Sequence, residues 1–128
     1  MTRMPVYSEA APKALGPYSQ AVRAGDTLYL SGQVPLDPAT GEIVVGDIAV
    51  QATRVFENLK AVLTAAGATF DDVVRVGIYM TDLGNFGAVN EVMQKYFREP
   101  YPARSTIGVA ALPKGAAVEV DVVAVKGR

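Results

Sequence analysis

Arg104 is the residue of this 128-residue chain whose type and setting point most directly to chemistry. It lies in residues 101–113 (YPARSTIGVAALP), where most other side chains are apolar or small. Pro100 and Pro102 stiffen the approach, because each fixes its own φ and biases the preceding residue toward extended geometry. A guanidinium in an apolar strand needs an anionic partner, and its planar fork of donors matches a carboxylate. Arg104 therefore binds either a carboxylate ligand or, as a structural ion pair, an acid of the chain itself.

The residue types that the chain lacks restrict its chemistry. It has no cysteine, so a disulfide, a thiolate nucleophile or a zinc–sulfur site is excluded. It has no histidine, which removes the usual general base and the commonest metal ligand. The 12 basic residues are scattered and are matched by 13 acidic ones, which argues against nucleic acid as a partner. Chemistry must come from Arg, Tyr, Asp, Glu, Ser, Thr, backbone groups and water.

Hydrophobic periodicity predicts one domain over residues 1–128, with elements in the order β-β-α-β-α-β-β. Apolar residues recur at helical spacing from 48 to 66, with Asp47 placed to cap the start and Gly67 the end. A second amphipathic helix begins near Asn85 and ends before Pro100. Strands are predicted over residues 27–31, 73–80, 104–109 and 118–125, and the end of segment 16–22 is placed to pair with 27–31 as a hairpin.

Two details of the strands bear on the site. Gly32 is predicted to end the strand 27–31. The strand 73–80 alternates, which predicts two faces with different side chains: Val74, Val76, Ile78 and Met80 on one, and Arg75, Gly77 and Tyr79 on the other.

Two helices cover only one face of a mixed sheet, so the predicted class is α+β with both helices packed on one face. The other face would carry Val123 and Val125 beside Glu119 and Asp121. This face is too apolar to be left in water, and burial against identical subunits is the natural solution. We therefore expect a homo-oligomer with its sites at the clefts between subunits.

The chain also shows no feature of a membrane protein. Its first residues contain no apolar core of signal-peptide length, and no apolar run is long enough to span a bilayer. The sequence therefore predicts a soluble cytoplasmic protein without a membrane partner.

Four segments resemble, in sequence and order, the Rid (reactive intermediate deaminase) family of YjgF-like proteins: GPYSQAV at 16–22, SGQ at 31–33, YPARST at 101–106 and VEVDVVAV at 118–125. The match covers nearly the whole chain, and Arg104 resembles the arginine of the archetypal subgroup, which hydrolyses 2-iminobutanoate and 2-iminopropanoate. The resemblance implies a chorismate-mutase-like fold, a homotrimer and active sites between adjacent subunits. It also implies that no cofactor or metal is needed.

The resemblance assigns roles to individual residues. Arg104 matches the clamp for the substrate carboxylate, and Glu119 matches the group that aligns the attacking water and accepts its proton. Tyr18 matches a pocket tyrosine, and Ser31 and Gly32 match a loop that forms part of the pocket wall. From the residues alone, Glu119 and Asp121 are equally the polar side of an alternating strand, Tyr18 an ordinary loop aromatic and Gly32 a tight turn.

Two further positions complete the candidate substrate-binding set. Asn90 matches a recurrent family position on the second helix, although a polar residue facing outward on a helix needs no function. Thr106 stands where several relatives carry a cysteine, so a reading that needs a thiol there does not apply. Backbone groups at position 106 remain available to bind the imine nitrogen.

Two alternatives to deaminase activity follow from the same sequence. The first is a non-catalytic or chaperone-like trimer whose clefts bind metabolites. The second is an endoribonuclease or translation inhibitor, an activity attributed to some relatives. The even charge balance and the lack of histidine weigh against RNA cleavage. A sensor would keep Arg104 without needing Glu119, and both residues are present.

Overall fold

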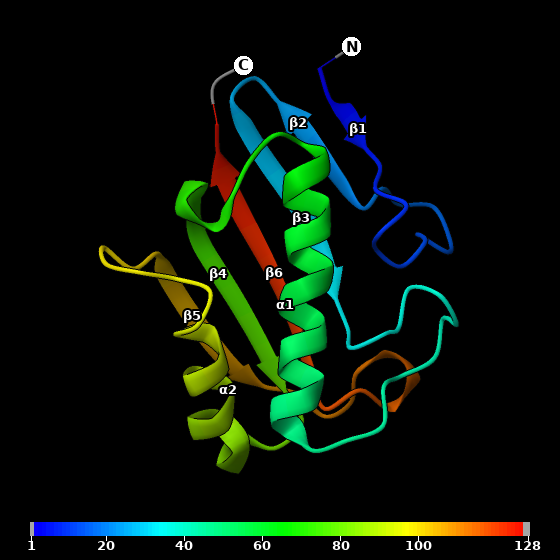
Figure 1. Cartoon of the computed structure of the whole chain (residues 1–128), viewed down its shortest axis with the longest axis vertical. Helices are drawn as coiled ribbons and strands as arrows, with labels where there is room; N and C mark the ends of the chain where they lie inside the picture. The colour runs from blue at the N-terminus through cyan, green and yellow to red at the C-terminus, as the bar shows by residue number, and fades with distance from the viewer. Residues whose placement is uncertain (1, 127–128) are drawn as a thin grey trace.

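The computed structural model describes residues 2–126 as a six-stranded mixed sheet with two α-helices on one face (Figure 1). The helices are α1 (Ile48–Ala65) and α2 (Phe86–Met93). The strands are β1 (Met4–Val6), β2 (Ala21–Ala24), β3 (Thr27–Gln33), β4 (Val73–Met80), β5 (Ala103–Gly108) and β6 (Val118–Val125). The predicted α+β fold is confirmed, and β1 is an additional strand. Its three residues are too few to show a hydrophobic period.

The strand order across the sheet is β1-β2-β3-β6-β4-β5. All neighbours are antiparallel except β4 and β5, which α2 connects as a crossover, since parallel strands cannot be joined by a tight turn. The last strand, β6, is inserted between β3 and β4, and β5 forms one edge. Residues far apart in the sequence are thereby placed on adjacent strands.

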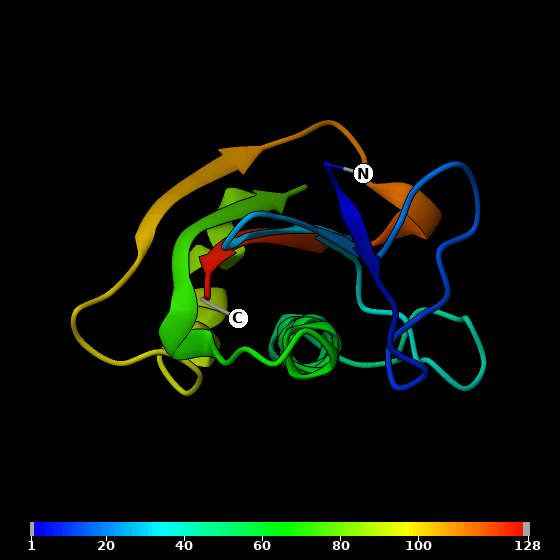
Figure 2. The ribbon, with the colours of Figure 1, turned by 90° about the horizontal axis from the view of Figure 1, so that it is seen from above.

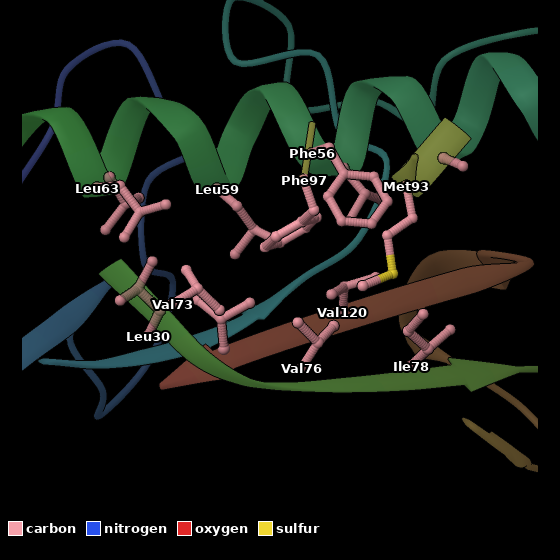
Figure 3. Close-up of a cluster of buried hydrophobic side chains, with 14 of the residues drawn as sticks. Leu30, Phe56, Leu59, Leu63, Val73, Val76, Ile78, Met93, Phe97 and Val120 are labelled. Carbon is pink, nitrogen blue, oxygen red and sulfur yellow. The ribbon is translucent and has the colours of Figure 1, made fainter. Parts of the chain in front are cut away.

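Helix α1 follows the predicted pattern at both ends. The Asp47 side chain accepts a hydrogen bond from the Val50 N–H at 3.0 Å, and Gly67 adopts a φ of +77° just after the helix. The core lies between α1 and the sheet (Figure 3). It is formed by side chains that include Phe56, Leu59 and Leu63 from α1, Met93 from α2, Val76 and Ile78 from β4, and Val120 from β6.

Two strand predictions need correction, and both involve irregular pairing. Strand β3 does not end at Gly32 but continues to Gln33, because a register shift against β6 between Leu30 and Gln33 accommodates the glycine inside the strand. In β4 a similar shift between Val73 and Arg75 turns Val73 toward the core and leaves Val74 47% exposed. A bulge changes the face of the residues beside it, and alternation alone does not reveal one.

The second face of the sheet carries apolar side chains that no helix within residues 2–126 covers. Figure 2 shows α1 on one side of the sheet, and within residues 2–126 no helix lies over the other side. Tyr29, Ile107 and Val125 are each about half exposed on this open face, and Val123 is half-buried. The predicted uncovered face is confirmed for the single chain, whereas the oligomer stays a prediction. Neither helix in the described part of the chain is long and apolar enough to cross a membrane.

Candidate active site

Arg104 lies on the edge strand β5 and points to the helix side of the sheet. It pairs in register with Val76, a core residue of β4, so the two side chains share a face. Its Nη1 donates to the Asn90 Oδ1 at 2.7 Å and contacts the Met93 Sδ at 3.6 Å, and its Cζ lies 5.0 Å from the centroid of the Phe86 ring. These three partners belong to α2 and are neutral, and the ring contact is a cation–π interaction.

The structural ion pair considered for Arg104 is not formed. Within residues 2–126 the one ion pair joins Arg98 and Asp71 at 2.6 Å, on the surface. Glu119 and Asp121 lie on the opposite face of the sheet from Arg104. The guanidinium is therefore held in place by neutral groups, and its charge remains available to an anion.

A cavity of about 340 Å³ opens beside this guanidinium, within the range of small-molecule sites. It is lined by Asn90, Met93, Gln94, Tyr101, Pro102 and Arg104. Thr106 follows two residues later on the same face of β5, and its Oγ1 is buried without a hydrogen-bond partner among the described residues. This hydroxyl is almost inaccessible in the single chain, and Thr106 is not among the residues that line the cavity.

Glu119 lies on β6, on the open face, where its Cα partner is Tyr79 of β4. Burial raises the pKa of the Glu119 carboxyl, and the negative charge of Asp121 raises it further. The Tyr79 hydroxyl donates to the Asp121 Oδ2 at 3.1 Å. Burial, together with this carboxylate, raises the pKa of Tyr79. Glu119 is thus half-buried in the single chain, with its proton affinity raised by its surroundings.

Gly32 is explained by Glu119 rather than by a turn. The φ of Gly32 is not in the left-handed region. A Cβ at this position would lie 2.6 Å from the Glu119 Oε2, closer than such atoms approach. The missing side chain therefore makes room for the Glu119 carboxyl on the neighbouring strand.

Ser31 positions a loop rather than offering a free hydroxyl proton. Its N–H donates to the Gln20 carbonyl at 2.9 Å, and its Oγ donates to the Ser19 carbonyl at 2.6 Å. These bonds hold the segment that carries Tyr18, whose side chain is 53% exposed. The buried side chain of Gln20 holds the same segment against the N-terminal residues: it accepts from the Ser8 N–H at 2.7 Å and donates to the Ser8 and Pro12 carbonyls. Sequence reasoning missed the role of Gln20, since its burial does not show in a local pattern.

The candidate residues form two half-sites on opposite faces of the sheet. The first, which we call the arginine half-site, contains Arg104, Asn90 and Thr106. The second, the glutamate half-site, contains Glu119 and Gly32, and the adjacent Ser31 of β3 binds the segment that carries Tyr18 through the Ser19 carbonyl. Strand β4 separates β5 from β6, so one chain does not bring Arg104 and Glu119 into one cleft. No cluster of three or more Asp or Glu side chains suited to a metal ion occurs within residues 2–126.

Comparison with known proteins shows the family of this chain. The model of a protein family described as endoribonuclease L-PSP matches residues 8–126. Protein DfrA of Myxococcus xanthus is 58% identical over 98% of this chain and 97% of its own length. A 2-iminobutanoate/2-iminopropanoate deaminase of Dermatophagoides farinae is 50% identical over 90% of each chain. The crystal structure of RidA from Psychrobacter sp. PAMC 21119 superposes with a TM-score of 0.91 at 46% identity, covering 95% of this chain and 98% of that one.

The chain belongs to this L-PSP family, the YjgF-like or Rid family whose motifs it carries. The family resemblance stated from the four segments is confirmed, and so is the fold class. The family and its members bear different names, among them endoribonuclease, DfrA and deaminase. Membership in the family therefore does not specify the substrate of this chain.

Proposed function

We propose that the protein hydrolyses reactive 2-imino acids, such as 2-iminobutanoate and 2-iminopropanoate, to 2-oxo acids and ammonia. The observation that carries this proposal is Arg104, held by neutral partners of α2 beside a cavity of about 340 Å³. A fixed, unneutralised guanidinium in a cavity of this size favours a small carboxylate ligand. The deaminase name of the relative from Dermatophagoides farinae supports the same substrate class.

The complete site, in this proposal, forms between two copies of the chain. The arginine half-site of one subunit faces the glutamate half-site of its neighbour, because a single chain holds them on opposite faces. The uncovered face with Tyr29, Ile107 and Val125 supports such an assembly, since its apolar area is buried when copies associate. A homotrimer is the arrangement that the family resemblance implies, and a location in the cytoplasm is part of the same proposal.

The reaction requires little from the protein beyond positioning and proton transfer. The carbon of the C=N bond is already electrophilic. Arg104 holds the adjacent carboxylate, and this orients the imine carbon for attack by a water molecule. As the C–O bond forms, Glu119 accepts a proton from this water, and the electron pair of the C=N bond moves to the nitrogen, which takes a proton from solvent. Glu119 then returns its proton to the nitrogen, the C–N bond breaks to release ammonia, and the hydroxyl proton passes to solvent to leave the 2-oxo acid. Thr106 lies on the Arg104 face, with its hydroxyl unpaired in the described chain.

The direct test measures decay of an imine formed in the assay. An amino-acid-processing enzyme generates 2-iminobutanoate or 2-iminopropanoate in the presence of semicarbazide, and semicarbazone formation is followed by absorbance. The proposal predicts that the purified protein suppresses semicarbazone formation in proportion to its concentration. Binding of 2-oxobutanoate without any suppression would identify a metabolite-binding protein instead. Cleavage of a labelled RNA by the same preparation, with no effect on the imine, would favour the ribonuclease alternative.

The first prediction from this proposal concerns assembly. We expect a stable trimer at micromolar concentration, because the half-covered sheet leaves apolar side chains on its open face. Sedimentation equilibrium is expected to give three times the 13.5 kDa mass of one chain. A folded monomer at this concentration would contradict both the trimer and a site shared between subunits.

The second prediction concerns Gly32→Ala. The new Cβ would displace the Glu119 carboxyl, because the two would lie 2.6 Å apart. We expect kcat to fall by roughly tenfold or more, since a misplaced base loses much of its effect. The melting temperature is expected to change little, because the displaced atoms end a flexible side chain.

Gly87→Ala is the matched control for this variant. Gly87 lies in α2, and a Cβ there meets nothing within 4 Å. Alanine also favours a helix over glycine by about 1 kcal/mol, so the control is expected to be at least as stable as the parent. Full activity of Gly32→Ala would show that the close approach to Glu119 has no catalytic importance.

A further inference from the structure

A second carboxylate lies beside Glu119 in the glutamate half-site. Asp121 is two residues further along β6, so both side chains project from the open face, with their Cα atoms about 7 Å apart. Both residues are half-buried in the single chain. Like charges at this separation oppose each other's ionisation unless a cation lies between them.

Tyr79 orients Asp121 and not Glu119. Its Cα partner across the strands is Glu119, yet its hydroxyl reaches diagonally and donates to the Asp121 Oδ2 at 3.1 Å. Gly77, directly opposite Asp121, makes this contact sterically feasible. A Cβ at Gly77 would overlap the Asp121 Oδ1 and lie 2.9 Å from the Tyr79 Oη.

The two carboxylates thus share one arrangement. Each lies over a glycine of a neighbouring strand: Glu119 over Gly32 of β3, and Asp121 over Gly77 of β4. Any side chain at either glycine would close the space, because its Cβ already collides with the carboxylate. The glycines therefore hold both acids close to the sheet, and the Tyr79 hydrogen bond keeps one of them in a defined position.

Within residues 2–126 of one chain, Asp121 is the nearest charged neighbour of Glu119 on this face. In the proposed assembly the arginine half-site of the neighbouring subunit also faces Glu119, and this cation is the same in the parent and in Asp121→Asn. From β4 the face carries Arg75 and Tyr79, from β3 Tyr29, and from β5 only uncharged side chains. Arg75 pairs with Val123, four residues and roughly 13 Å along the strand from Glu119. Its guanidinium contacts the Ser105 Oγ at 3.4 Å, toward β5. Burial and the Asp121 charge both raise the pKa of Glu119.

We propose that Asp121 is a positioning residue for imine hydrolysis, a negative charge oriented by Tyr79 that makes Glu119 a stronger proton acceptor. The inference rests on the proposed function. Glu119 takes the proton from water and returns it during loss of ammonia, whereas Asp121 exchanges no proton with the substrate. Asp121 acts through the field at Glu119, because a base whose proton affinity lies nearer the working pH transfers protons more effectively.

The test is Asp121→Asn, which removes the charge but keeps an oxygen to accept the Tyr79 hydrogen bond. Two readouts are compared in the parent and the variant: the pH dependence of kcat/KM, and the carbon-13 NMR titration of the Glu119 carboxyl. We expect both acidic midpoints to move down by about half a pH unit, as Coulomb's law gives for charges about 7 Å apart in a water-like dielectric. We also expect kcat/KM above both midpoints to fall by about twofold, because only part of this interaction energy of about 0.6 kcal/mol is expressed in the rate.

Asp26→Asn is the matched control, because it makes the same change of net charge in the turn before β3. Thr27, the next residue, pairs with Val125, so Asp26 lies about six residues along the sheet from Glu119. The control is expected to leave both midpoints unchanged. Melting temperatures of both variants verify that the fold is intact.

The two readouts separate this inference from the proposed function. If the parent protein does not hydrolyse imines, the proposed function fails, and a shifted titration still shows the electrostatic coupling. A Glu119 carboxyl that titrates at the same pH in the parent and in Asp121→Asn overturns the inference. A shifted titration beside an unshifted rate profile also overturns it, because Glu119 would then not limit the rate.

Discussion

Arg104→Ala is expected to lower kcat/KM for 2-iminobutanoate hydrolysis by at least about 100-fold, with little loss of stability. The guanidinium supplies two parallel donors to the substrate carboxylate, and loss of correct orientation alone costs about this factor. Stability should change little, because Arg104 is exposed and no buried charge is left without a partner. The substitution removes only one hydrogen bond to Asn90, one contact with Met93 and the cation–π interaction with Phe86. The measurements are the imine assay, binding of 2-oxobutanoate and the melting temperature.

Two further variants sharpen this prediction. Arg104→Lys is expected to recover only part of the activity, since an ammonium cannot reproduce two parallel contacts to one carboxylate. Arg98→Ala is the matched control: it removes a surface arginine that donates to both carboxylate oxygens of Asp71, and it should keep full activity. Its effect on stability should be about 1 kcal/mol or less, as for other exposed pairs.

The opposite pattern would exclude the proposed role of Arg104. If the melting temperature of Arg104→Ala is much lower than that of the parent while its activity per folded molecule is normal, the role of Arg104 is structural. Such a result would mean that Arg104 stabilises the fold although it has no acidic partner within residues 2–126.

Glu119→Gln is expected to lower kcat by about 100-fold, the lower end of what a positioned general base contributes. Glutamine keeps the size of the side chain and an acceptor oxygen, but it cannot take a proton from water. Binding of 2-oxobutanoate should persist, because the carboxylate is held by Arg104 and not by Glu119. An unchanged kcat would show that Glu119 has no catalytic role and is only a polar residue on the open face of β6.

The same variant has an expected effect on stability that depends on pH. The folded protein raises the pKa of Glu119 above its unfolded value, so the folded state binds this proton more tightly. Its contribution to stability is present below the ordinary glutamate pKa and is lost as pH rises through the raised pKa. Glutamine removes this dependence. Relative to the parent, Glu119→Gln should therefore gain stability as the pH rises from about 4 to 8.

Thermal unfolding across this pH range measures the difference in stability between Glu119→Gln and the parent. Glu42→Gln is the matched control, since Glu42 is exposed and the same substitution there removes a carboxylate that water already solvates. A difference between Glu119→Gln and the parent that stays constant with pH would show that folding does not shift the proton affinity of Glu119.

Features that depend on neighbours along the chain can be predicted from the sequence alone. The helical period of 48–66, the Asp47 cap and the alternation of 118–125 are local patterns, and the structure contains each of them. The lack of histidine and cysteine restricted the chemistry before any fold was known. Four motifs in order were enough to predict the family. Arg104 and Glu119 were likewise selected from the sequence, by setting and by resemblance.

The positions of these candidates relative to one another depend on contacts between distant segments and are seen in the folded chain. Insertion of β6 between β3 and β4 places Glu119 over Gly32, and parallel pairing of β5 with β4 turns Arg104 to the opposite face. These are pairings between distant segments, and side chains alternate with a period of two, so a shift of one residue moves a side chain to the other face. The bulges beside Val74 and Gly32 are such shifts, and they are set by partner strands that no local pattern reveals.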